Sequence, residues 1–297
     1  MKLIKQSFEI LEQKDYSLIG IKKFIERCGR VCYKSEDKIT DDSYEKFVNM
    51  LEKRDHARPL EFGTVHLKMP WINFNNFVGF CISKDVWDSC WIKYYIDRDS
   101  ENKMVYITTN YRYYKRLKSL KSLYGYINVE EFFTEEDNEY YPKRYTVHFI
   151  ISRGVMDEFR THVGLSHLAE STRYCNYSKD KFDNQVTFVI PNWCNSLKEG
   201  SEQNYPPFEI NEDEIIFMNA LQNAQNSYLS LLKLGWTPQQ ARDVLSLSVK
   251  SELISCGFKD AWENFFYRRC AKDAHPMARE ITIPLQEKFK ELNYDNQ

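Results

Sequence analysis

Apolar and polar residues alternate along several short segments of the chain and recur at helical spacing along longer ones. A period of two predicts a strand with one buried face, whereas recurrence every three to four residues predicts an amphipathic helix. The first pattern predicts strands at 62–69, 104–109, 144–153, 186–190 and 249–258. The second predicts helices at 16–30, 41–54, 71–80, 111–123, 211–234, 259–274 and 277–292, and the start of another after residue 153.

Two helix starts carry capping signals. Thr40 or Asp41 offers a side-chain oxygen to the unpaired amides in the first turn of the helix 41–54. The run 237–240, Thr-Pro-Gln-Gln, has the spacing of a capping box with proline at the first helical position, and predicts a helix that continues through Leu247. Strands and helices follow one another without regular βαβ alternation. We therefore expect an α+β fold, with a mixed or antiparallel sheet and packed helices.

Composition narrows the class of protein. The chain has 297 residues, of which 42% are hydrophobic, and a net charge of -2, so an anionic ligand would need a local cluster of cations. No apolar run has the length of a signal peptide or a membrane helix. The eight cysteines and six histidines lack the spacing of a disulfide framework or a zinc site. We expect a cytoplasmic protein with reduced thiols that binds no metal, nucleic acid or membrane.

Hydroxyl and basic side chains that suit a phosphate are concentrated in the segment 166–182. Ser171, Thr172, Arg173 and Ser178 lie within eight residues, and hydroxyls, backbone amides and a guanidinium are the groups that bind a phosphate monoester. A polar surface loop with a helix cap would explain the same composition. The chain has no G-x-G-x-x-G motif and no P-loop, so neither a Rossmann nor a Walker nucleotide site is expected.

Four further candidates lie elsewhere in the sequence. Arg268 and Arg269 are adjacent on a predicted helix and must point about 100° apart, so one can face solvent while the other reaches a buried anion. A solvated pair near the helix C-terminus would explain them equally well. Arg242 is placed early in a capped helix, where the dipole disfavours a cation, which hints at a functional partner. His56 lies in a loop, where a histidine is more often structural than catalytic.

Four blocks of the sequence resemble the flavin-dependent thymidylate synthases, in that family's order. They are 29–43 with 53–69, 153–159 with 166–182, 241–253, and 261–280. The first includes a loop histidine before Pro-x-Glu, the second ends in S-x-R-Y at Ser171, Arg173 and Tyr174, and the last is similar to an N-F-x-x-x-R block. Residues 70–143 look like a family-variable insertion within a single domain that spans 1–297.

The resemblance implies a ThyX-like α+β fold and synthesis of dTMP from dUMP. It implies methylenetetrahydrofolate as carbon donor, NADPH and bound FAD as the source of electrons, and a homotetramer with sites shared between subunits. Arg269 would be catalytic by stabilising negative charge on the pyrimidine. The implied dUMP contacts are Glu158, Arg160, Glu170, Ser171, Thr172, Arg173 and Arg242. The implied FAD contacts are His56, Arg58, Thr161, His162, Val163 and Asn264.

The chain departs from the family at the FAD motif. The family's R-H-R aligns with 161–163, Thr-His-Val, so only the histidine is kept, and Arg160 lies one position earlier. The family's next carboxylate aligns with Ala169, and Glu170 stands one residue later. Arg58 occupies a position where a small hydroxyl residue is usual, and would supply the FAD diphosphate with the charge that the motif lacks. Two alternatives remain, a pyrimidine-nucleotide hydroxymethylase on the same scaffold and a catalytically silent nucleotide-binding homologue.

Overall fold

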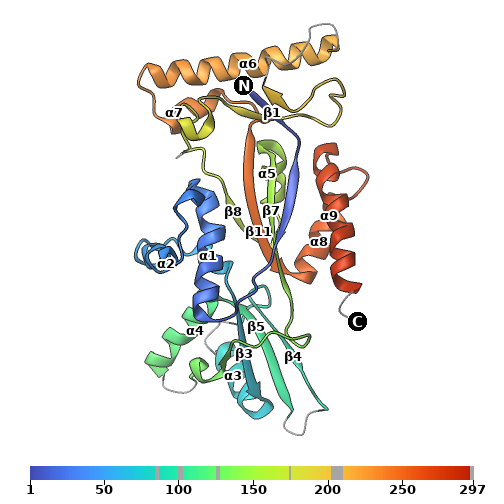
Figure 1. Cartoon of the computed structure of the whole chain (residues 1–297). Coiled ribbons are helices and arrows are strands. Elements are labelled where there is room, and N and C mark those ends of the chain that lie inside the picture. The colour runs from blue at the N-terminus through green and yellow to red at the C-terminus, as the bar shows by residue number, and fades with distance from the viewer. Residues whose placement is uncertain (84–86, 100–102, 125–127, 174, 202–209, 295–297) are drawn as a thin grey trace.

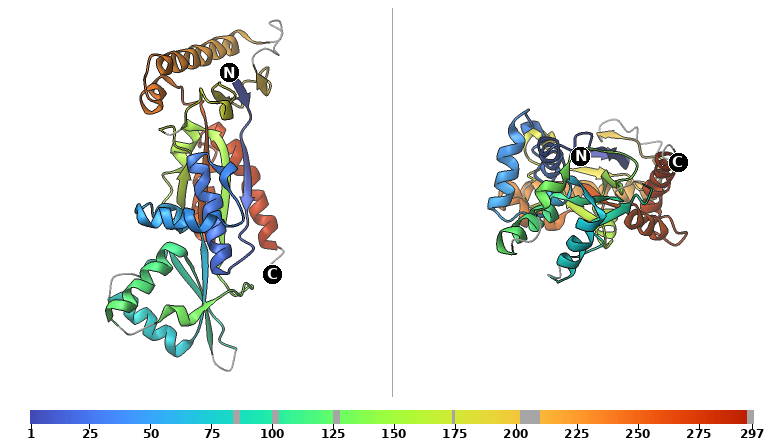
Figure 2. Two further views of the ribbon diagram at one scale, coloured as in Figure 1. Left: turned by 60° about the vertical axis from the view of Figure 1, so that its left-hand side comes forward. Right: turned by 90° about the horizontal axis from the view of Figure 1, so that it is seen from below.

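Residues 1–83, 87–99, 103–124, 128–173, 175–201 and 210–294 are described by the computed structural model, which has three sheets arranged along one long axis (Figure 1). The long helix α6 crosses one end, a four-stranded sheet occupies the middle, and a second four-stranded sheet lies at the other end. The left view in Figure 2 shows the same elongated outline, with the distal sheet at the end opposite α6, and the right view looks along the long axis.

The central sheet carries most of the predicted site. Its strands are all antiparallel and lie in the order β2 (Ser7–Leu11), β7 (Arg144–Ser152), β11 (Lys250–Phe258) and β8 (Ser166–Ala169). The predicted strands 144–153 and 249–258 form its centre and pair along their full length, from Ser152 with Lys250 to Arg144 with Phe258. Because β11 is covered on both faces, every residue from Ser251 to Phe258 is buried.

Helices cover the two faces of this sheet unequally. On one face α1 (Leu18–Tyr33) packs Phe24 and Cys28 against Ile254 and Cys256 of β11. The opposite face is covered by α5 (Arg153–Phe159), α8 (Lys259–Arg269) and α9 (Pro276–Tyr294). Trp262 of α8 is fully buried there and its indole N–H donates to the carbonyl of Tyr145 at 3.1 Å. Burial of this ring anchors α8, and therefore the arginines at the end of α8, to the sheet.

The distal sheet has a hydrophobic core of its own. Its strand order is β4 (Ile92–Ile96), β5 (Met104–Asn110), β3 (Thr64–Pro70) and β6 (Phe133–Thr134), and it packs against α3 (Trp71–Ser83) and α4 (Tyr111–Tyr124). Three tyrosines of α4, at 111, 113 and 114, are buried in this core. The described part of the segment predicted to be an insertion, 70–143, is thus largely folded. Residues 125–127 lie outside the described residues, Val129 of the 3₁₀ turn Val129–Phe132 is buried in the core, and β6 pairs with β3.

A third layer closes the end near the N-terminus. Strands β10 (Gly200–Ser201), β1 (Lys2–Ile4) and β9 (Thr187–Val189) form a small sheet, beside which lie α6 (Glu212–Lys233) and α7 (Pro238–Ala241). The remaining helix, α2 (Ser43–Lys53), packs on α1. Within the described part of the chain no helix has the length and apolar character needed to cross a membrane. The same residues bring together no group of three or more metal-ligating side chains suited to an ion.

Three predictions of helix boundaries are wrong. The helix predicted at 259–274 ends at Arg269, and residues 270–275 form a turn that leads into α9. The capping box at Thr237 is present, but α7 ends at Ala241 and is followed by the 3₁₀ turn Arg242–Val244, because the chain must turn there to enter β11. The N-cap of α2 is Asp42, and its side chain makes no capping bond. Instead Asp42 accepts a hydrogen bond from the hydroxyl of Thr40 at 2.8 Å.

Candidate nucleotide-binding and catalytic site

The segment that follows β8 reaches α7 and forms an open cleft with it. Arg242 donates from Nη1 to Oγ1 of Thr172 at 3.0 Å, and Arg173 donates from Nε to Oε1 of Gln239 at 3.3 Å. The cleft has a volume of about 580 Å³ and is lined by Arg173, Trp236, Gln239, Gln240, Arg242 and Asp243. Two guanidiniums and a single carboxylate line it, so the cleft favours an anion.

Local sequence explains how α7 presents this face. The backbone N–H of Thr237 donates to Oε1 of Gln240 at 2.9 Å, which completes the capping box and sets the start of the short helix. Arg242 then falls at the C-terminal end of α7, not early in a longer helix. The argument that the helix dipole disfavours Arg242 is therefore wrong, because a cation at the C-terminal end is favoured.

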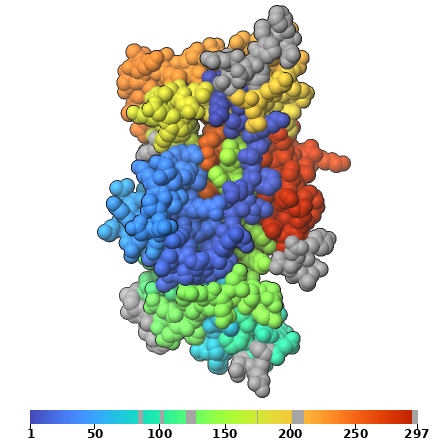
Figure 3. All heavy atoms as spheres, viewed as in Figure 1, coloured from blue at the N-terminus to red at the C-terminus, as the bar shows by residue number. Residues whose placement is uncertain are grey.

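The S-x-R element is fixed through its backbone. Ser171 N–H donates to the carbonyl of Cys32 at 3.2 Å, and the carbonyl of Ser171 accepts from Cys175 N–H at 3.0 Å. Tyr174, the last residue of the S-x-R-Y match, lies outside the described residues. Glu170 is 1% exposed, and its carboxylate accepts from Lys250 at 2.9 Å within the protein interior, outside the cleft lining. In Figure 3 the segment after β8 covers the surface between α6 and the α1–α2 pair.

Arg269 lies in a second group, at the turn that follows α5. Its Nε donates to Nε2 of His162 at 2.8 Å, its Nη1 to Oε2 of Glu158 at 2.6 Å, and its Nη2 to the hydroxyl of Thr161 at 3.2 Å. Nη2 also donates to the carbonyl of Glu158 at 2.7 Å. The neighbouring Arg268 is exposed, as expected for two arginines on successive helical positions. Arg269 is thus the one that reaches an anion.

Histidine chemistry helps to orient this group. Burial, together with the charges of Arg269 and Arg268, lowers the pKa of His162 to about 4, so the ring is neutral at pH 7 and its Nε2 accepts from Arg269. Burial likewise lowers the pKa of His167 to about 4. The Nε2–H of His167 donates to the His162 carbonyl at 3.3 Å, and its Nδ1 accepts from Ser255 at 2.9 Å.

The other predicted FAD residues are spread over both sides of β8. His56 is exposed and its Nδ1 contacts the hydroxyl of Tyr33 at 3.0 Å. Val163 is 89% exposed, and Asn264 accepts from Arg268 at 3.3 Å on the surface of α8. The side chain of Arg58, which is 57% exposed, lies 3.5 Å from the carboxylate of Glu61.

Arg58 and Arg160 both act electrostatically on His167. The charges of both arginines contribute to the lowered pKa of His167, after the larger effects of burial and His162. Arg160 is 46% exposed in its side chain and lies 3.7 Å from Asp157. Two guanidiniums, about half exposed and about 100 residues apart in sequence, therefore act electrostatically on the same imidazole.

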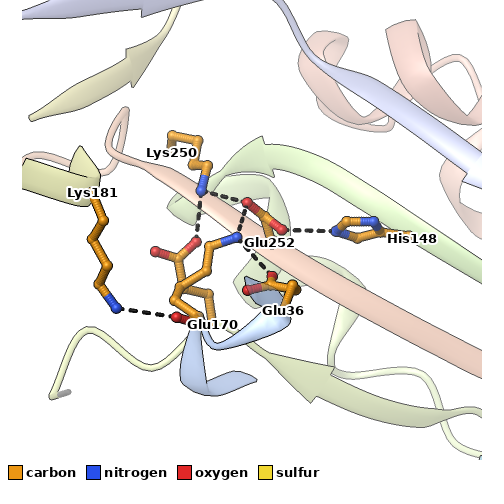
Figure 4. A network of polar contacts seen from close by, with 7 residues as sticks. Glu36, His148, Glu170, Lys181, Lys250 and Glu252 are labelled. Carbon is orange, nitrogen blue, oxygen red and sulfur yellow. Dashed lines mark hydrogen bonds and ion pairs between the residues drawn. The ribbon is translucent and has the colours of Figure 1, made fainter. Parts of the chain in front are cut away.

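Sequence reasoning missed a group of buried charges directly beneath Ser171. Lys250, Lys34 and His148 converge on Glu252, and Lys250 also contacts Glu170, as Figure 4 shows. The signal was present in β11, since Lys250 and Glu252 are two residues apart in an otherwise apolar strand and must point to the same face. A second missed feature is a more enclosed cavity of about 600 Å³ between the central and distal sheets, whose lining contains none of the predicted site residues.

Comparison with known proteins connects this arrangement to one family. Two solved structures are similar in fold, those of a UMP/dUMP methylase PolB from Streptomyces cacaoi bound with 5-Br dUMP and with 5-Br UMP. They share 15% and 14% identity with the chain, cover 98% of it and 93% and 92% of their own length, and each has a TM-score of 0.43. Likeness at this level does not identify a shared activity.

Sequence comparison is more informative. No curated protein matches the chain. The model of the family described as thymidylate synthase complementing protein matches residues 143–292, which is 150 of the 297 residues. The match contains every predicted site residue except His56 and Arg58. The chain therefore belongs to the thymidylate synthase complementing protein family, the family of the flavin-dependent thymidylate synthases.

Proposed function

We propose that this protein is a flavin-dependent thymidylate synthase, which converts dUMP to dTMP with methylenetetrahydrofolate as carbon donor and NADPH as reductant. The observation that carries the proposal is the pair of guanidiniums, Arg173 and Arg242, beside Thr172 in the cleft against α7. A nucleotide monophosphate offers a compact dianion, and arginines with a neighbouring hydroxyl are the groups that recognise it.

Arg269 is proposed to act on the pyrimidine. An arginine remains protonated under all working conditions, so its charge is available when negative charge develops on the ring as C5 becomes nucleophilic. In the described part of the chain four of its five N–H groups have partners, which fix the plane of the guanidinium. The remaining N–H on Nη1 is the donor that we assign to the substrate.

The residues present fit a flavin dinucleotide through its diphosphate. Arg58 and Arg160 supply two accessible cations in one electrostatic environment, which compensates for Thr161 and Val163 in place of the family's arginines. When bound, FAD would supply the hydride that reduces the transferred carbon to a methyl group. His56 and Asn264 are proposed as further FAD contacts.

Sharing of sites between subunits is part of the proposal. On one chain the Arg242 group lies beside α7, the Arg269 group lies at the end of α5, and Arg58 lies on the side of β8 that faces α1. A homotetramer would allow groups from different copies to face one substrate. At dUMP concentrations well below the raised KM of Arg242→Ala, mixing this variant with Arg269→Ala should restore part of the activity if sites are shared.

Product analysis tests the reaction. The protein, reconstituted with FAD, is incubated with dUMP, methylenetetrahydrofolate and NADPH, and the nucleotide product is identified by mass. A methylated product is expected, whereas a hydroxymethylated product would assign the chain to the sister reaction. A folded protein that retains FAD but neither binds dUMP nor changes it would overturn the proposal.

A further inference from the structure

A cluster of buried charges lies directly beneath the predicted nucleotide-binding loop (Figure 4). The ammonium of Lys250 donates to Glu170 at 2.9 Å and to Glu252 at 2.6 Å. Lys34 forms a second ion pair with the same oxygen of Glu252. The other carboxylate oxygen of Glu252 accepts from Nε2 of His148 at 2.9 Å.

These charged side chains are largely buried. The side chains of Glu170 and Glu252 are 0% and 8% exposed, and those of Lys34 and Lys250 are 15% and 16% exposed. Burial alone would raise the pKa of Glu252, but the hydrogen bond from His148 and the charges of Lys250 and Lys34 hold that pKa well below its usual range. Two cations and two anions balance here, and such a cluster is stable only while all its members are present.

Hydrogen bonds to backbone carbonyls join the loop to the two elements that carry the cluster, α1 and β11. Glu170 N–H donates to the carbonyl of Glu252 at 2.8 Å, and the next residue, Ser171, donates to Cys32 at the end of α1. Lys181, which follows the loop, donates from Nζ to the carbonyl of Lys34 at 3.1 Å. The loop is therefore attached to α1 and to β11 at points adjacent to the charged side chains.

Lys34 adopts a backbone conformation that supports a specific role. It is the C-cap residue of α1 and has φ 48, in the left-handed region where a residue with a Cβ is strained. Its side chain points back to Glu252 and also lies 3.3 Å from Glu36. Glycine would adopt this backbone conformation without strain but could not form the ion pairs. The strain at Lys34 is therefore offset by the contacts of its side chain.

We propose that Lys34, Glu170, Lys250 and Glu252 are positioning residues, which hold the loop 170–173 in the geometry that receives the nucleotide phosphate. This proposal rests on the proposed function, because it takes Ser171 to Arg173 as the phosphate-binding element. The physical basis is preorganisation: a loop already ordered in its binding geometry loses less conformational entropy when the anion arrives. The family resemblance implies a dUMP contact for Glu170, but its carboxylate is buried against Lys250 outside the cleft lining, so the role proposed for it is positional.

Two variants and a matched control test the role of the cluster. Glu170→Gln keeps the shape of the side chain and removes its charge, and Lys34→Gln removes an ion pair at the other end. Lys68→Gln is the control, since Lys68 pairs with Glu136 at 2.8 Å on the distal sheet, away from the loop. The first measurement is amide hydrogen exchange at Ser171 and Cys175, which should become about tenfold faster in Glu170→Gln and Lys34→Gln and stay unchanged in the control.

The second measurement is the affinity for dUMP by calorimetry, with KM and kcat measured separately. Both cluster variants should weaken dUMP binding about tenfold, the loss expected for one charged hydrogen bond, while kcat at saturation stays within about twofold. Unchanged exchange in a folded Glu170→Gln protein, or faster exchange with unchanged dUMP affinity, would overturn the inference. If the wild-type protein binds no dUMP, the proposed function fails, and the exchange comparison still decides whether the cluster holds the loop.

Discussion

The guanidiniums of Arg269 and Arg242 are held in opposite ways. Arg269 is 18% exposed in its side chain and makes four hydrogen bonds to the turn after α5. Arg242 is 36% exposed, donates to Thr172, and borders an open cleft. A cation that must keep one orientation during a reaction needs many fixed partners, whereas a cation that captures a diffusing anion needs access to solvent. The difference fits the roles proposed for the two residues, catalysis for Arg269 and phosphate binding for Arg242.

The strongest test of this contrast is removal of Arg269. Arg269→Ala should lower kcat by about 100- to 1000-fold, the loss typical of a group that stabilises charge in a transition state. Arg268→Ala, which removes the exposed neighbour on the same helix, is the control and should retain near wild-type kcat. If the two variants lose activity equally, Arg269 has no special role.

Removal of Arg242 should instead affect binding. Arg242→Ala should raise KM for dUMP by about 10- to 100-fold with a smaller change in kcat, because a charge-assisted hydrogen bond to phosphate is lost before the chemical step. Steady-state kinetics over a range of dUMP concentrations checks this. A fall in kcat with unchanged KM would erase the distinction between the two arginines.

Of the two arginine groups, the Arg269 group should respond to acidic pH, because His162 belongs to it. The pKa of His162 is lowered to about 4, below its unfolded value of about 6.5, so the unfolded chain takes up a proton first and stability falls as pH drops from about 6.5 toward 4. Between pH 7 and pH 5 the wild-type protein should lose about 2 kcal/mol more unfolding free energy than His162→Gln. Urea unfolding of both proteins at the two pH values measures the difference. Equal losses would mean that His162 titrates normally.

Arg58 offers the smallest and most specific effect. Arg58→Ala should weaken FAD retention about tenfold while the fold is kept, since one of two cations assigned to the diphosphate is removed. Flavin content after gel filtration, with circular dichroism as the check on folding, gives the answer. Arg54→Ala on the nearby surface is the control, and an unaltered flavin content in Arg58→Ala would remove Arg58 from the site.

The two central strands were predictable because each spans nine residues, enough for a strand pattern to be recognised, and the long helix α6 because its pattern spans many turns. Short edge strands such as β8 were not, since four residues carry too little periodicity to be distinguished from a loop. The end of α7 was mispredicted because the turn into β11 overrides the local helical preference. Local pattern therefore located the elements that build the core but not the short ones that carry the site.

Residue type and a family-like motif were enough to indicate Arg173, Arg242 and Arg269. A guanidinium is positively charged and offers the same hydrogen-bond donors at any position in the fold. Which partner each arginine meets was decided only by packing of α5, α7 and α8 around the sheet. The same holds for Lys34 and Lys250, which are over 200 residues apart and meet on Glu252. The charge of a side chain is known from the residue type, but its ion-pair partner is set by distances between side chains in the folded protein.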